Sequence, residues 1–263
     1  MRSFLAAIAF YTVIPLPKKL TLHFDRVARW LPLVGLVIGI LLAGMDALLA
    51  WVVPPAMQSL LVVCLWLGIT GGLHLDGAMD TADGLAAGNG PIGDHGSIQG
   101  TQRRLQAMVD SSAGAFGVMV AIALILLKFV AAMHLPEPRW VWWLLVPVWG
   151  RWAQLAAISF YPYLKREGKG RFLKDTTCPV DLAIASGGVL VMMLALRLAV
   201  HSMVLFPVWG LGCVAISLGI GWWFNRQLGG QTGDTYGATV EWTEALSLAI
   251  ATVQIPGLPG LGG

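Results

Sequence analysis

The sequence predicts an all-α fold, a polytopic membrane bundle of about six spanning helices in one domain. The 263 residues are 57% hydrophobic and 12% charged, whereas soluble domains are roughly 45–50% apolar and about 25% charged. The mean hydropathy is +0.73. Uncharged apolar runs recur at about 20 residues, the length that crosses a bilayer at about 1.5 Å per residue.

Six apolar segments predict the spans. The second is short, and its ends are the least well defined; Lys128, Arg151 and Arg197 interrupt the third, fourth and fifth. In chain order the segments are Trp30–Val53, Met57–Gly72, Phe116–Met133, Trp140–Phe160, Leu182–Val200 and Met203–Phe224. We expect Lys128 and Arg197 to extend towards a membrane surface from nearer the span ends.

Two further apolar pieces, Phe4–Ile14 and Ala245–Ile255, are too short to cross a membrane unaided. We expect each to lie at the interface, to re-enter, or to pack on the bundle.

Basic residues indicate the orientation. Pro15–Arg29 and Tyr161–Asp181 hold nine of the 17 Lys and Arg residues, and cytoplasmic loops carry such an excess. Counting spans places Leu73–Ala115 and Asn225–Glu244 on the same side. The pattern predicts a multi-pass protein of the cytoplasmic (inner) membrane with these loops in the cytoplasm. No basic tract with interleaved aromatics indicates nucleic acid, and self-association stays open.

The stretch "HLDGAMDTADG" concentrates acids directly after the second span. On a helix, Asp76, Asp80 and Asp83 stand at i, i+4 and i+7 and therefore share one face. Gly77 tolerates the close approach of another backbone, so a locally broken helix is an alternative. Three carboxylates on one stripe repel one another unless a cation lies between them, and hard oxygen ligands suit Mg²⁺ or Mn²⁺. The plainer alternative is a solvated helix end.

The connection 73–115 has a glycine-rich middle, which we interpret as a mobile flap, and ends in "MVDSSAGAFG". Here Asp110 is a candidate further metal ligand, Ser111 and Ser112 offer hydroxyl donors, and Gly114 and Gly117 permit close packing. The alternative is an N-cap of the next helix, which would also suit a phosphate.

A second acidic segment, 225–244, follows the last span. Its candidate substrate- or cofactor-binding residues are Asn225 and Arg226 for phosphate, Thr232 and Thr235 as hydrogen-bond donors, and the acids Asp234, Glu241 and Glu244. A polar turn is the alternative. Arg151 lies inside a predicted span, where an ionisable group usually faces a cavity or an acidic partner. We expect its partner to be a substrate phosphate or one of the aspartates.

Several motifs together resemble the cobalamin (5′-phosphate) synthase family, also called adenosylcobinamide-GDP ribazoletransferases. They are "FYTVIPLP", "GGLHLDGAMDTADGL", "RRLQAMVDSSAGAFGV", "GRWAQLAAISFYPYLKREGKG" and "LGGQTGDTYGATVE", in that order over nearly the whole chain. The departures, Met79 and Tyr236, are conservative.

The resemblance implies a membrane enzyme of the last stage of vitamin B12 assembly. It implies transfer of adenosylcobinamide phosphate from adenosylcobinamide-GDP to a ribose hydroxyl of α-ribazole or its 5′-phosphate, with release of GMP and a requirement for Mg²⁺. On that hypothesis the metal ligands are Asp76, Asp80 and Asp83, with Asp110 as a further ligand or as the base. Arg104, Arg151 and Arg226 would stabilise phosphate charge.

Two alternatives are weighed against this interpretation. A CDP-alcohol phosphatidyltransferase also binds metal at a span end, but the run that begins at Asp76 lacks the Ala and Arg of that family's Asp-Gly-x-x-Ala-Arg pattern. A transporter would place its ionisable residues near the bilayer midplane, in two matched halves, whereas these acids gather at one face.

Overall fold

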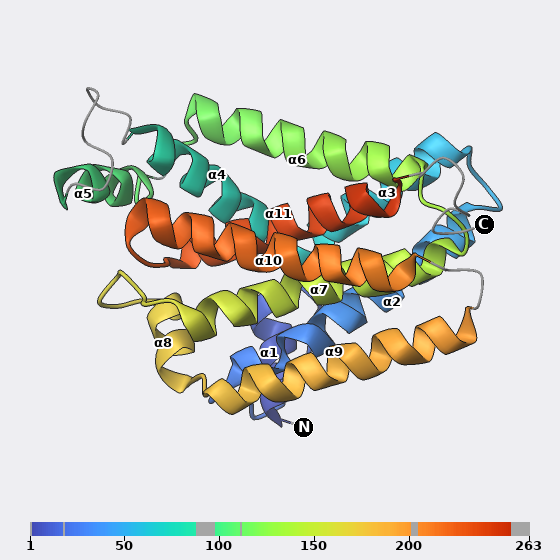
Figure 1. The fold of residues 1–263 in the computed structure, drawn as a ribbon, viewed down its shortest axis with the longest axis horizontal. Coiled ribbons are helices and arrows are strands. Elements are labelled where there is room, and N and C mark those ends of the chain that lie inside the picture. The colour runs from blue at the N-terminus through green and yellow to red at the C-terminus, as the bar shows by residue number, and fades with distance from the viewer. Residues whose placement is uncertain (1, 18, 88–97, 111, 201–204, 254–263) are drawn as a thin grey trace.

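The structure, a computed structural model of the protein, describes residues 2–17, 19–87, 98–110, 112–200 and 205–253. Across these ranges the chain is helical and contains no strand. The helices are α1 (Arg2–Tyr11), the short 3-10 helix η1 (Val27–Trp30), α2 (Leu31–Leu49), α3 (Pro55–Thr70), α4 (Leu73–Ala87), α5 (Ile98–Ala107), α6 (Ala115–Met133), α7 (Arg139–Phe160), α8 (Lys169–Thr176), α9 (Pro179–Ala199), α10 (Phe206–Leu228) and α11 (Gly233–Ala251). Figure 1 shows the long helices lying side by side in one bundle.

The six segments predicted to span the membrane are largely helical where the structure describes them, which confirms the class of helical membrane bundle with four to five rather than six candidate spans. Among the described residues, four helices are long and apolar enough to cross on their own: Val27–Leu49, α6, α9 and α10. The second predicted span, Met57–Gly72, is α3 and ends at a sharp bend. Gly71 and Gly72 both have positive φ, at 60° and 70°, a region that glycine enters without steric cost. There the chain bends by 86° between α3 and α4.

Apolar side chains cover the outer surface of the bundle. Exposed large hydrophobic residues follow the outward faces of three helices: Val118, Met119, Ile122 and Leu126 of α6, Ile184, Leu190, Val191 and Leu194 of α9, and Val208, Leu211 and Trp222 of α10. Apolar surface of this extent suits contact with lipid chains rather than water.

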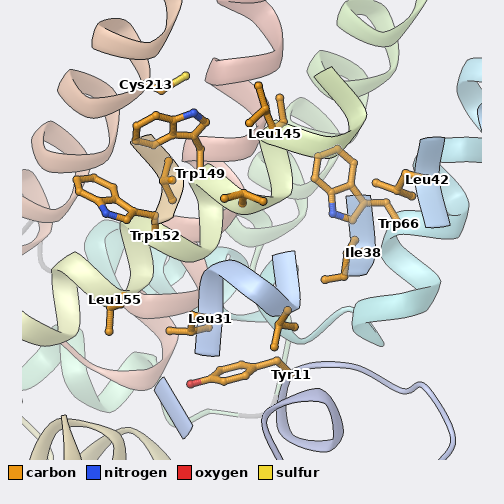
Figure 2. Packing of buried hydrophobic residues seen from close by; sticks show 14 of the residues in the cluster. Tyr11, Leu31, Ile38, Leu42, Trp66, Leu145, Trp149, Trp152, Leu155 and Cys213 are labelled. Carbon is orange, nitrogen blue, oxygen red and sulfur yellow. The ribbon is translucent and has the colours of Figure 1, made fainter. Parts of the chain in front are cut away.

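The interior of the bundle is built around α7. Its segment from Val141 to Ile158 is buried except for Leu144, and it packs against α2, α9, α10 and α11. Figure 2 shows Leu31, Ile38 and Leu42 of α2 among side chains from α3 and α7. The N-terminal apolar piece packs on the bundle as α1, with Ala6, Ala7, Ile8 and Tyr11 buried.

The prediction of a loop over 225–244 is wrong. Asn225 to Leu228 complete α10, the turn 229–232 is short, and α11 runs from Gly233 through the acids to Ala251. The apolar piece beginning at Ala245 is therefore the second half of this helix. Thr232 and Thr235 start α11 by a reciprocal capping box, which satisfies N–H groups that a helix start leaves unpaired.

Four buried charges hold α11 in place, and we call them the four-charge cluster. Lys128 of α6 contacts Glu241 and Glu244 of α11 at 2.7 and 2.8 Å. Arg151 of α7 contacts Glu244 at 2.7 Å. All four side chains are at most 3% exposed. Two positive and two negative charges balance, which buried ions require.

This cluster corrects three predictions. Lys128 does not extend to the membrane surface; its ammonium group is buried and also lies 4.3 Å from the Trp66 ring centroid. The protein partner of Arg151 is Glu244 rather than an aspartate, and the expectation of a substrate phosphate stays a prediction. Glu241 is a buried ion-pair partner rather than a substrate ligand.

The segments predicted to share one side of the membrane lie together. Arg26 of the first basic segment forms an ion pair with Asp181, at the end of the second. In Figure 1, α5, α8 and the C-terminal end of α10 gather at the left end of the bundle.

Removing one charge from the four-charge cluster should be costly. Lys128→Met leaves Glu241 buried without a cation, and loss of one partner of a buried pair typically costs about 3–5 kcal/mol. We therefore expect a clearly lower unfolding temperature in detergent, measured by differential scanning fluorimetry. Asp175→Asn, at an exposed pair on α8, is the control and should leave that temperature unchanged. Equal unfolding temperatures for both variants would contradict the structural role of the cluster.

Candidate active site

Helices α4 and α11 cross at two glycines. A Cβ atom on Gly77 would lie 2.7 Å from the carbonyl oxygen of Asp234, and one on Gly237 would lie 3.1 Å from the carbonyl oxygen of His74. Only glycine permits such an approach of two helix backbones. The prediction that Gly77 accommodates another backbone is confirmed.

The crossing brings acids from two helices together. Asp76 and Asp234 line one pocket, and the half-buried Asp80 lies within electrostatic range of Asp76, Asp83 and Asp234. We call Asp76, Asp80 and Asp234 the acid cluster. The predicted shared face of the α4 acids is confirmed for Asp76 and Asp80, and α11 adds the third carboxylate.

A basic loop faces the acid cluster. The loop 161–168 pairs with the turn before α11, because the Leu164 N–H donates to the Gln231 carbonyl at 2.9 Å and the Gln231 N–H donates to the Pro162 carbonyl at 2.8 Å. This pairing lets Lys165 Nζ reach Asp234 Oδ2 at 2.9 Å. It also stacks Tyr163 on Tyr236, with ring centroids 5.7 Å apart. Burial, and then the Asp234 charge, raises the pKa of Tyr163.

The pocket between these groups has a volume of about 330 Å³. Its charged lining comprises Asp76, Asp234, Lys165, Glu167 and Lys169. The starts of two helices, Gly170 in α8 and Gly233 in α11, also line it. Helix N-termini favour anions because their N–H groups and dipoles point outward. Carboxylates, lysines and helix starts together suit a ligand that carries both phosphate and a divalent cation.

Asp83 has a different role from its two neighbours. Its Oδ2 accepts the N–H of Gly114 and its Oδ1 accepts the N–H of Gly117, each at 2.8 Å. A Cβ on either glycine would collide with this carboxylate. Asp83 therefore caps α6 from α4, and its role as a metal ligand stays a prediction.

Asp110 is not brought to the acid cluster by any contact of the described residues. Its Oδ1 accepts the N–H and hydroxyl of Ser112 at 3.0 and 2.7 Å, and these bonds lower the pKa of Asp110. Its side chain is exposed, so its role as ligand or base stays a prediction. Ser111 lies outside the described residues.

The structure does not bring the predicted phosphate-binding residues to the pocket. Arg104 is buried, and its guanidinium donates to the Gln227 carbonyl at the end of α10. Arg226 lies over the exposed Trp222 ring, 5.4 Å from its centroid. Thr235 is part of the α11 cap. Asn225 and Arg226 belong to α10 and are not part of the pocket lining.

Sequence reasoning missed several lining residues. Lys165 and Lys169 served only to orient the chain, although basic residues beside Gly168 and Gly170 were a usable signal for anion binding. The most buried polar residues of the lining, which mark its inner end, are Tyr11, His74, Gln154 and Tyr236. They come from four helices and carry no shared local motif.

No three His, Cys, Asp or Glu side chains in the described ranges are placed to hold a metal by themselves. The donors still fit Mg²⁺, because this ion is commonly held by one or two carboxylates, with water and substrate phosphates completing its octahedron. Of the charges acting on Asp80, three are negative and only Lys165 is positive. A second cation would relieve that repulsion.

Fold and site together define a class: helical membrane proteins with a pocket lined by acids and lysines at one end of the bundle. The model of the family "Cobalamin-5-phosphate synthase" matches residues 3–252. The chain belongs to the cobalamin-5-phosphate synthase family. This confirms the resemblance carried by its motifs.

Curated relatives cover almost the whole chain. A protein of Synechococcus elongatus named adenosylcobinamide-GDP ribazoletransferase is 48% identical over 249 residues, 92% of each chain. Relatives of the same name from Trichormus variabilis and Brevibacillus brevis are 48% and 35% identical, over 95% of this chain and 96% and 97% of theirs. No solved structure matches the chain significantly.

Adding one methyl group at the helix crossing should disturb the site. Gly77→Ala places a Cβ against the backbone of Asp234, and overpacking of this kind typically costs about 1–3 kcal/mol. We expect a lower unfolding temperature in the purified protein. The matched control is Gly44→Ala in α2, where the added Cβ meets nothing within 4 Å. If both variants unfold at the same temperature, α4 and α11 do not pack as closely as described.

Proposed function

We propose that this protein transfers the adenosylcobinamide-phosphate group of adenosylcobinamide-GDP to a ribose hydroxyl of α-ribazole or its 5′-phosphate, with release of GMP. The observation that carries the proposal is the pocket lined by Asp76 of α4, Asp234 of α11, Lys165 and Lys169, with Asp80 within electrostatic range of both acids. The names of the relatives support the donor substrate and the transfer.

The reaction exchanges one phosphorus–oxygen bond for another. The hydroxyl oxygen bonds to the phosphorus that carries the cobinamide, and the bond from this phosphorus to the oxygen shared with GMP breaks. The hydroxyl proton passes to a carboxylate of the acid cluster, and GMP leaves with the shared oxygen. Such a transfer needs neutralisation of phosphate charge and an in-line nucleophile.

The residues of the pocket divide this work. Lys165 and Lys169 offer positive charge to the diphosphate, and the starts of α8 and α11 add their dipoles. Asp76, Asp80 and Asp234 would hold Mg²⁺, or Mn²⁺ in its place, which when bound supplies further neutralisation of the diphosphate oxygens. Lys165 pairs with Asp234, so this lysine is positioned between the acids and an incoming phosphate.

The proposal also concerns the place of the reaction. The pocket lies at the end of the bundle where the basic segments gather, and the excess of Lys and Arg there favours the cytoplasmic side of the inner membrane. Substrates would reach it from the cytoplasm. The apolar outer faces of α6, α9 and α10 support lipid as the surrounding medium.

Loss of one acid-cluster carboxylate should abolish most of the turnover. We expect Asp80→Asn to lower kcat/KM by about 100-fold or more, because it removes a metal ligand or proton acceptor. The assay is GMP release from adenosylcobinamide-GDP and α-ribazole by protein in nanodiscs. Asp175→Asn on exposed α8 is the matched control, expected to match the wild type. A fully active, folded Asp80→Asn variant would show that the acid cluster is not where the chemistry occurs.

Metal removal supplies an independent prediction. Chelation with EDTA should stop GMP release, and Mg²⁺ or Mn²⁺ should restore it. Asp76→Asn and Asp234→Asn should each require more Mg²⁺ for half-maximal activity than the wild type does, because each loses a negative oxygen ligand. An unchanged Mg²⁺ requirement in both variants would remove these two residues from the proposed ligand set.

A further inference from the structure

The pocket has an inner end that differs in chemistry from its charged mouth. Tyr11 of α1, His74 of α4, Gln154 of α7 and Tyr236 of α11 line it, and we call these four residues the inner polar group. Tyr11, His74 and Tyr236 are each 1% exposed and Gln154 is 4% exposed. Four helices thus deliver one neutral polar side chain each to the same cavity.

Polar atoms of this group lack partners. Among the described residues, no hydrogen-bond partner is present for the hydroxyls of Tyr11 and Tyr236, both ring nitrogens of His74, or Oε1 of Gln154. Buried polar atoms are bonded in the large majority of cases. Five such atoms around one cavity indicate that a ligand supplies the partners.

The donors and acceptors of the group define that ligand. A tyrosine hydroxyl donates and accepts, a neutral imidazole does one of each, and the Gln154 oxygen only accepts. A fully ionised phosphate only accepts hydrogen bonds and would leave the Gln154 oxygen without a donor. Sugar hydroxyls match the set, because each of them donates and accepts.

We propose that the inner polar group binds the ribose hydroxyls of the acceptor, ribazole, while the charged mouth holds the diphosphate. This inference rests on the function proposed above. The whole pocket, mouth included, has a volume of about 330 Å³, at the small end of the roughly 300–1,000 Å³ of ligand pockets. It therefore suits a nucleoside-sized acceptor better than a corrinoid joined to a nucleotide.

The arrangement aligns the two substrates. His74 and Asp76 on α4 line the pocket, and so do Tyr236 and Asp234 on α11. Each of the two crossing helices therefore presents one hydroxyl-binding side chain and one acid. An acceptor held at the inner end directs a hydroxyl towards the diphosphate at the mouth, which is the geometry that in-line attack needs.

The test measures binding rather than turnover. Titration calorimetry of α-ribazole, without Mg²⁺ or donor substrate, would compare the wild-type protein in nanodiscs with Tyr11→Phe and Tyr236→Phe. Each variant deletes one hydroxyl, and we expect a Kd about fivefold weaker for each. The Kd of adenosylcobinamide-GDP with Mg²⁺ should stay within about twofold. Tyr161→Phe, whose hydroxyl is not part of the pocket lining, is the matched control and should bind both ligands as the wild type does.

Any of the following results would overturn the assignment of the inner polar group to the ribose of ribazole. Weaker binding of adenosylcobinamide-GDP with unchanged ribazole affinity would place the donor at the inner end. Unchanged affinity for both ligands in folded variants would leave the inner polar group to ordered water. The free azole base of ribazole, which lacks the sugar, should bind wild type and Tyr236→Phe equally; a difference would place the base against Tyr236.

The same measurements separate this inference from the proposed function. If wild-type protein binds no ribazole and releases no GMP, the function itself fails. If wild-type protein binds ribazole and the two tyrosine variants bind it equally well, only the placement of the acceptor fails.

Discussion

The four-charge cluster is the constraint on which the remaining structure depends. Glu241 and Glu244 can be buried in α11 only because Lys128 and Arg151 meet them from α6 and α7, and an uncompensated ion at that depth would be prohibitively costly. The pairing sets the rotation and depth of α11 in the bundle. The first turn of α11, with Asp234, then has one available position, beside α4.

Close packing of α4 against α11 brings the acids of the two helices together. Gly77 and Gly237 let α4 and α11 approach until their backbones touch, so that Asp76 and Asp80 share space with Asp234 although 154 residues separate Asp80 from Asp234 in the chain. The bridge from Leu164 to Gln231 then fixes Lys165 opposite these acids. Helix packing and this loop-to-turn pairing together assemble the charged mouth from segments that are far apart in the chain.

Features that depend on neighbouring residues could be predicted from the sequence, whereas features that depend on distant partners could not. Apolar length and acid spacing are local properties, so the six helices and the shared face of Asp76 and Asp80 could be predicted. The segment 225–244 was predicted as a loop because its acidic side chains suggested contact with water. The cations that allow Glu241 and Glu244 to be buried lie more than 90 residues away in the chain. Arg104 and Thr235 were predicted to bind substrate for the same reason: nothing local indicates that a backbone carbonyl or a helix cap is their partner.

The pocket is lined by α1 and α11, the first and last helices of the described residues, through Tyr11 and Tyr236. During synthesis on the ribosome, the cavity therefore cannot form until the final helix has emerged and entered the bundle. Lys128 and Arg151 enter the membrane before their glutamates exist, and a charge in that state is unfavourable. Insertion of α11 relieves this unfavourable state and completes the cavity in a single event, so an unfinished chain has no site at which to bind substrate.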